Sequence, residues 1–147
     1  VGSTGGSLFL TWTEHSEFWN NHISRVSGIS GGVYGFKGRE CRYCRIHHNT
    51  VKVNFAIEFP FENDWNVEID HNFLDGVISI PKYSGGPSTV PGDYSFYIHH
   101  NLFFRSYSLE WARNLAIVSN NLFSFSTSSD GGNLISDFGN VVAPGGT

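Results

Sequence analysis

The feature that most constrains this chain is an asparagine that returns with nearly the same neighbours. An aliphatic residue lies three positions before each asparagine, and apolar residues follow it. The clearest copies are residues 45–51, 68–74, 97–103 and 117–123, and weaker copies surround Asn21 and Asn140. Successive asparagines are 28, 23, 29, 20 and 19 residues apart. Because no unit of this size can bury its own apolar face, such a repeat predicts stacked supersecondary units.

Composition favours strands and turns over helices. The 147 residues include 17 Gly, five Pro and 13 Phe, with no Met, and no stretch shows sustained helical periodicity. Basic residues are scattered and the formal net charge is -4, which argues against a nucleic-acid partner. No apolar run reaches the length of a membrane span, so we expect none. The chain is long enough for one domain with a continuous core.

The repeats divide the chain into three parts. Residues 1–16 form a Gly/Ser/Thr-rich lead-in, residues 17–142 form about six coils, and residues 143–147 form a tail. Each coil is predicted to hold three short strands, which around Asn49 are 43–48, 50–53 and 55–59. Alternation within that coil points one set inward, Cys44, Ile46, Val51 and Ile57, and another outward, Arg45, His47 and Glu58.

The repeated asparagine is expected to form a turn. Asparagine tolerates the left-handed backbone region, so we expect it to adopt that conformation here. Its amide can also bond to the amide of the next coil at the strand spacing of about 4.8 Å. Parallel connections favour right-handed winding.

With these Ile-x-x-Asn-x-apolar repeats across about residues 17–142, the chain resembles the right-handed parallel β-helix proteins of the pectate-lyase-like superfamily. The resemblance implies an all-β fold, a single-stranded right-handed parallel β-helix (solenoid) of about six coils with an asparagine turn ladder. It also implies an extracellular or periplasmic protein that acts on carbohydrate. The superfamily includes lyases, hydrolases, epimerases, tailspikes and structural proteins, so the fold alone does not select an activity.

One column of side chains could carry catalysis. Nine positions after successive asparagines lie Glu58, Pro81, Glu110 and Asp130, and one position further lie Phe59, Lys82, Trp111 and Gly131. This strand resembles the one that floors the substrate groove in the lyases. Glu58 and Glu110 are then expected about 9–10 Å apart, two coils from each other, with Lys82 on the coil between them.

This column resembles the residue types of calcium-dependent alginate and chondroitin lyases, which cleave uronic-acid polymers by β-elimination. The resemblance implies a Ca²⁺ ion held by Glu58, Glu110 and Asp70, because Ca²⁺ prefers oxygen ligands. Lys82 would be the base, and Arg113 or Tyr83 would assist the departing oxygen. Trp111, Phe59, His47 and His99 would contact an acidic polysaccharide. The alternative is that Glu58, Lys82 and Glu110 form a solvated, stabilising ladder of opposite charges.

A second outward column contains His47, Asp70, His99 and Ser119, two positions before each asparagine. This column could bind a transition metal, although three ligands in one column suit tetrahedral coordination poorly. The other interpretation is a surface ladder of side chains that share protons. His48, His71 and His100 are expected to take part in the turn. The chain also has more aromatic residues than a thin core can hold, so some rings should face outward and stack on sugars or on another chain.

Cys41 and Cys44 are three positions apart. Cys44 aligns with core positions, so we expect a small core residue beside a turn cysteine. A metal site would need a second ligand pair, and a redox pair remains a further interpretation.

A structural role is the alternative to carbohydrate chemistry. An uncapped coil presents unpaired backbone groups, and natural solenoids need caps for solubility. The chain could therefore stack end to end into a filament or belong to a longer β-helix with flanking coils. A tailspike-like adhesive module would bind oligosaccharide without turnover.

Overall fold

The computed structural model describes residues 6–25, 32–59, 64, 66–79, 96–104, 107–108, 116–123, 134–138 and 141–142. Within these ranges the chain is all-β, with no helix, and no segment has the length and apolar character of a membrane-spanning helix. The strands are β1 (Gly6–Thr11), β2 (Glu17–Trp19), β3 (His22–Ser24), β4 (Tyr34–Arg39), β5 (Arg45–His47), β6 (Thr50–Glu58), β7 (Val67–Asp70), β8 (Phe73–Ser79), β9 (Phe96–His99), β10 (Leu102–Phe103), β11 (Tyr107–Ser108), β12 (Ala116–Ser119), β13 (Leu122–Phe123), β14 (Leu134–Phe138) and β15 (Val141–Val142).

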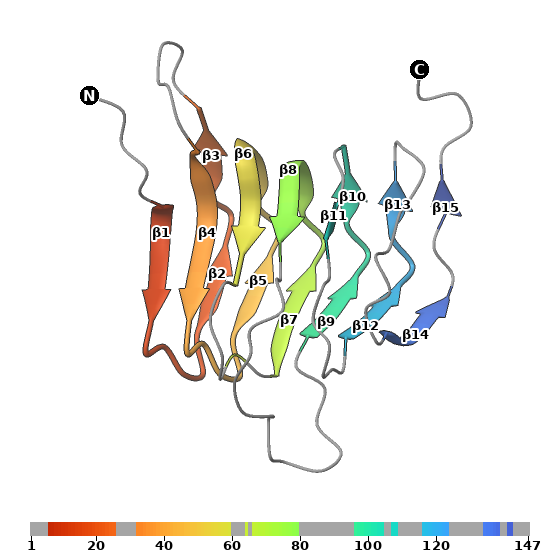
Figure 1. Cartoon of the computed structure of the whole chain (residues 1–147), viewed down its shortest axis with the longest axis horizontal. Helices are drawn as coiled ribbons and strands as arrows, with labels where there is room; N and C mark the ends of the chain where they lie inside the picture. Colours follow the sequence, from red (N-terminus) through yellow and green to blue (C-terminus); the bar gives the residue numbers. More distant parts are fainter. Residues whose placement is uncertain are drawn as a thin grey trace.

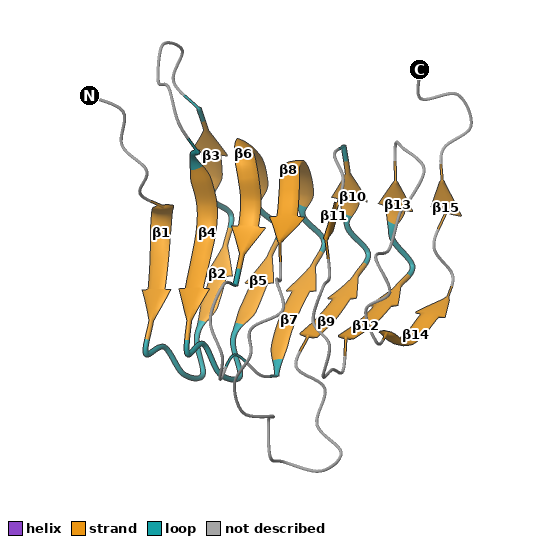
Figure 2. Ribbon diagram, viewed as in Figure 1, coloured by secondary structure: helices purple, strands orange, loops and turns teal. Residues whose placement is uncertain are grey.

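The strands form two parallel sheets that run along the molecule (Figure 1). The six-stranded sheet has the order β14-β12-β9-β7-β5-β2. The nine-stranded sheet has the order β1-β4-β6-β8-β10-β13-β15, with β3 also paired to β6 and β11 to β8. Figure 2 shows in teal the described connections from one sheet to the other, as from β5 to β6 and from β7 to β8. This winding confirms the all-β fold with parallel strands and is compatible with a parallel β-helix.

The core lies between the two sheets and follows the alternation expected from the sequence. The aliphatic residue three positions before each asparagine is buried on successive strands, at Ile46, Ile69, Ile98 and Val118. All four residues predicted to point inward around Asn49 are buried: Cys44, Ile46, Val51 and Ile57. Each such aliphatic side chain removed from water contributes about 1.5–3 kcal/mol.

The predicted asparagine ladder is present at the junction of the two sheets. Asn49, Asn72, Asn101 and Asn121 are buried and stack on successive strands. The Asn49 backbone N–H and its side-chain Nδ2 both donate to Oδ1 of Asn72, each at 2.9 Å. Asn72 repeats both bonds to Asn101 at 3.0 Å. The ladder thus satisfies polar groups that would otherwise be costly to bury.

The prediction that the ladder asparagine adopts the left-handed conformation is wrong. The residue before it does so instead. Positive φ angles of 53–55° occur at the preceding residue, at Asn20, His48, His71, His100 and Asn120. The reason lies in the amide geometry, because Nδ2 of Asn49 donates to the carbonyl of His47, two residues earlier, at 2.9 Å. The residue between them must make the bend, and His and Asn tolerate the left-handed region better than bulky residues do.

The predicted division of the 50–59 segment is also wrong. Residues 50–58 form one nine-residue strand, β6, which pairs with the separate strands β3 and β4 on one side. Its pairing with β8 shifts by two residues along its length, from Lys52↔Asp75 to Glu58↔Ser79. The shift occurs where the backbone at 53–56 approaches Gly76: a Cβ there would collide with the Val53 carbonyl oxygen and lie 2.8 Å from the Ala56 nitrogen. Glycine makes this close approach possible.

Among the described residues, Glu58 shares its column with two serines. Glu58 pairs with Ser79, and Ser79 pairs with Ser108. Pro81, Lys82 and Glu110 lie outside the described residues, so the alignment of Glu58 with Glu110 across Lys82 stays a prediction.

Candidate functional site

The outer face of the six-stranded sheet carries most of the described polar side chains that interact with one another. Glu17, Arg45 and Glu68 occupy one outward column on β2, β5 and β7. The neighbouring column holds Trp19, His47, Asp70, His99 and Ser119. The second column does not lie on the surface as the expected proton-sharing ladder would, because Asp70 and Ser119 are fully buried and His99 is only 8% exposed.

Arg45 is the centre of this polar network. Its Nε and one terminal nitrogen donate to the two carboxylate oxygens of Asp70 at 2.8 and 2.7 Å. Glu68 lies 3.5 Å from the same guanidinium, and its other oxygen is 2.8 Å from Nε2 of His99. Bidentate pairing of this kind gives strong, well-oriented bonds.

The ionisation of Asp70 follows from these contacts. Burial alone raises the pKa of a carboxyl group, but hydrogen bonds from Arg45 and His71 outweigh it and lower the pKa of Asp70 to about 2. The same bond with Asp70 raises the pKa of Arg45. The pair is therefore ionised across the neutral range.

Three of the left-handed turn residues form a histidine stack, His48, His71 and His100, beside this network. Their ring centroids are 5.1 and 5.2 Å apart, and neighbouring planes differ by 4° and 5°. Each ring also contacts the residue before it: Nδ1 of His71 lies 2.7 Å from Asp70, and the Nδ1 atoms of His99 and His100 lie 2.7 Å apart. The repeated histidines thus belong to the turn, as expected, and form a continuous row of imidazoles.

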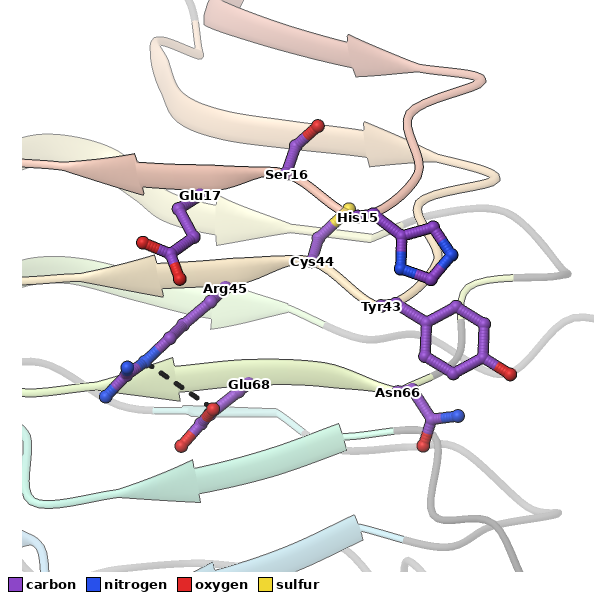
Figure 3. A pocket seen from close by; sticks show the side chains of 8 residues that line it. All are labelled: His15, Ser16, Glu17, Tyr43, Cys44, Arg45, Asn66 and Glu68. Carbon is purple, nitrogen blue, oxygen red and sulfur yellow. Dashed lines mark ion pairs between the residues drawn. The ribbon is translucent and has the colours of Figure 1, made fainter.

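An open groove of about 520 Å³ lies next to the network (Figure 3). Its lining comprises His15, Ser16, Glu17, Tyr43, Cys44, Arg45, Asn66 and Glu68. The Tyr43 ring, 45% exposed, stacks on His15 with a centroid distance of 4.8 Å and an interplanar angle of 3°. His15, Tyr43 and Asn66 all have φ near 50°, so a second left-handed turn column supplies one wall. The groove therefore combines a flat aromatic surface with charged hydrogen-bonding groups.

Glu68, Asp70 and His99 are the described residues best arranged to hold a metal. One donor atom from each lies within 4.8 Å of the others, and two carboxylates with one imidazole suit a divalent cation. The guanidinium of Arg45 already pairs with both carboxylates, so a metal ion would have to replace that cation.

The structure brings only part of the predicted site together. Asp70 and His99 are neighbours, and His47 pairs with Asp70 across β5 and β7. Glu58 lies on β6 of the other sheet and forms an ion pair with Lys37 at 2.7 Å, so it does not share ligands with Asp70. Lys82, Tyr83, Glu110, Trp111 and Arg113 lie outside the described residues.

Phe59 does not have the predicted role of an exposed sugar-stacking ring. Its side chain is fully buried, packs against Phe96 at 5.1 Å between centroids, and covers Gly38 so closely that no Cβ would fit there. The aromatic ring is more favourably placed in this core than in water.

The sequence interpretation missed Arg45, Glu68 and His71 as members of the site. The signal was present: the position four before each asparagine reads Glu17, Arg45 and Glu68, which alternate in charge on adjacent strands.

Comparison with family models, curated proteins and solved structures yields no match to this chain.

Proposed function

We propose that this chain is an extracellular or periplasmic glycan-binding domain that binds polysaccharide in the groove beside Arg45. In this proposal the fold is a right-handed parallel β-helix of about six coils, of the pectate-lyase-like kind. The observation that carries the proposal is the Tyr43–His15 stack beside Arg45 and Glu68. Sugar rings present apolar faces and polar edges, and this groove offers a flat ring for the former and charged groups for the latter.

The charges of the groove bear on which glycan binds. Glu17 and Glu68 line it together with a single arginine that is already paired to Asp70. An acidic polysaccharide would therefore need a bridging cation, and Ca²⁺ is the natural one because it accepts carboxylates from both partners. We expect binding of uronic-acid oligosaccharides to depend on Ca²⁺ and binding of neutral ones to be independent of it.

Polysaccharide lyase activity is the catalytic extension of this proposal. β-Elimination on a uronic-acid polymer would rest on Lys82 as base, with Tyr83 or Arg113 assisting the leaving oxygen. The described residues favour binding over turnover, because Glu58, one expected calcium ligand, is already neutralised by Lys37. Lys82→Ala tests the extension: it should abolish unsaturated products from alginate or pectin if the wild type releases them.

The binding proposal is tested by titration calorimetry with alginate, pectin and neutral oligosaccharides, with and without Ca²⁺. Tyr43→Ala should weaken binding about five- to thirtyfold, since a lost aromatic contact costs about 1–2 kcal/mol. Phe104→Ala is the matched control, because Phe104 is also 45% exposed but follows β10 of the other sheet. Equal affinity of the Tyr43→Ala protein and the wild type would refute the groove as the binding site.

A structural subunit is the second candidate, and one observation favours it. β1 and β2 are terminal strands of the two described sheets, and large aromatic side chains are exposed at this edge: Phe9, Trp12 and Trp19. Exposed strand edges with apolar side chains are templates for pairing with another chain or with flanking coils. Sedimentation at increasing concentration tests this role; Trp12→Lys should reduce any end-to-end association, and a wild type that stays monomeric would exclude self-assembly.

A further inference from the structure

The two cysteines occupy one tight turn between β4 and β5. Cys41 and Cys44 are 0% and 1% exposed, and both thiols are free. Each follows a residue in the left-handed conformation, Glu40 with φ 56° and Tyr43 with φ 51°. The backbone therefore bends at two places within this turn. The two thiols are three residues apart in this turn, and each shifts the pKa of the other. This confirms the expectation of a core cysteine, Cys44, beside a turn cysteine, Cys41, and both are buried.

The two sulfurs differ in environment. Cys44 lies in the wall of the groove, and its Sγ is 3.3–3.4 Å from the carbonyl oxygens of Arg42 and Thr13. The hydrogen bond from Cys41, together with one from the Ser16 backbone, lowers the pKa of Cys44, whereas the same thiol contact and burial raise the pKa of Cys41. Cys44 is thus the better nucleophile, and of the two cysteines it is the one that lines the groove.

A buried carboxyl group completes the cluster. The Cys41 backbone N–H donates to Oδ1 of Asp64 at 2.7 Å. Asp64 is 2% exposed, and within the described part of the chain its Oδ2 has no hydrogen-bond partner. Burial raises the pKa of Asp64 to about 8, so this group can exchange a proton near neutral pH. Glu14, Glu40 and Arg42 are the other charged groups that act on the cluster.

We propose that Cys41 and Cys44 are a reversible dithiol–disulfide pair, oxidised by a peroxide through Cys44 and closed by Cys41. The Cys44 thiolate attacks one oxygen of hydrogen peroxide, the O–O bond breaks, and hydroxide leaves and is protonated to water. Cys41 Sγ then attacks the sulfur of the resulting sulfenic acid. The protonated Asp64 carboxyl gives its proton to the sulfenic oxygen, which leaves as a second water, and then takes up the proton of the Cys41 thiol. Two thiols and one peroxide thus give one disulfide and two waters.

The first test uses the wild-type chain, so it does not depend on a variant that folds. Hydrogen peroxide is added to the reduced, folded protein, and intact mass and peptide mapping follow the thiols. We expect the loss of two hydrogen atoms, an intramolecular Cys41–Cys44 link, unchanged circular dichroism, and full reversal by dithiothreitol. Accumulation of sulfinic acid at Cys44, disulfide-linked dimers, or thiols that react only after unfolding would each overturn the proposal.

Three variants then assign the roles. Cys41→Ser should trap Cys44 as sulfenic and then sulfinic acid, and Cys44→Ser should react at least tenfold more slowly with peroxide. Asp64→Asn keeps the acceptor for the Cys41 N–H and should slow disulfide closure about tenfold without changing its extent. An unchanged closure rate would show that Asp64 has no part in the proton transfer.

Discussion

At the scale of single residues, a ladder asparagine uses both the oxygen and the nitrogen of its side-chain amide in hydrogen bonds. Oδ1 of Asn72 accepts from both the backbone and the side chain of Asn49, and its Nδ2 donates to the Ile46 carbonyl at 2.8 Å and to Asn101. A side chain that is bonded on every side fixes the separation and register of the strands around it.

Replacing one ladder amide should therefore be costly. Asn72→Ala leaves the Asn49 N–H and the Ile46 carbonyl buried without these partners, so we expect a loss of about 2–4 kcal/mol in the free energy of unfolding. Urea denaturation measures it. Asn54→Ala is the control, because Asn54 accepts one exposed bond from Arg25 and should lose under 1 kcal/mol. Similar losses in both variants would contradict the importance of the ladder.

Asp64 should make stability fall as the pH rises. Its pKa is about 8 in the folded chain and near 3.8 when unfolded, so between these values the folded state holds the extra proton. The free energy of unfolding should then decrease by up to about 1.4 kcal/mol per pH unit from pH 4 to pH 8.

Asp64→Asn resembles the protonated form and should remove this contribution. Thermal unfolding from pH 5 to 9 checks it: the variant should gain stability relative to the wild type at pH 8 and gain less at pH 5. A constant difference between the two proteins over that range would exclude Asp64 as the titrating group.

At the scale of elements, glycines decide where β6 bends. Ala56 packs between Gly76 of β8 and Gly35 of β4, where a Cβ at position 35 would lie 2.5 Å from the Ala56 carbonyl oxygen. The bend, the shifted register and the two neighbouring glycines form one structural unit.

Gly76→Ala should disturb that unit. The added methyl meets backbone atoms of β6 that cannot rotate away, so we expect a loss of about 1–3 kcal/mol in the free energy of unfolding. Gly32→Ala serves as control, since a Cβ there meets only ring and hydroxyl atoms at 3.4 Å or more. Equilibrium denaturation of both variants gives the comparison, and equal stabilities would argue against the close contact.

The limits of the sequence interpretation also lie at this scale. Alternation around the repeated asparagine correctly predicted the core residues of the six-stranded sheet and the amide ladder, because hydrophobic burial and buried amides constrain that corner directly. It did not predict the register of the nine-stranded sheet. That register depends on a backbone bulge at 53–56 and on Gly76, and counting residues from the asparagine assumes that no bulge is present. Glu58 lies beyond this bulge and pairs with Ser79, whereas Arg45 and Glu68 lie four positions before their asparagines and pair in register.

At the scale of the whole molecule, each described strand pairs with strands of the neighbouring passes, and the two sheets share one core. Stability in such an array is approximately a sum of local and nearest-neighbour contributions. Substitutions on adjacent strands should therefore interact, and distant ones should add.

A pair of double-mutant cycles tests this additivity. Each Ile→Val change at Ile46, Ile69 or Ile98 should cost about 0.5–1.5 kcal/mol. The adjacent pair at 46 and 69 should deviate from additivity by about 0.5 kcal/mol or more, and the pair at 46 and 98 should add within about 0.3–0.5 kcal/mol. Equal coupling energies in both pairs would contradict this nearest-neighbour description of the core.

The shifted pairing of β6 with β8 has a consequence for how such a protein can change over evolutionary time. The pairing of β6 with β8 shifts by two residues at a bulge, while the asparagine ladder continues in step from one coil to the next. An insertion or deletion in one coil therefore need not change how the strands of the next coil pair. We therefore expect the loops that border the groove to vary in sequence during evolution, while the asparagine ladder preserves the fold.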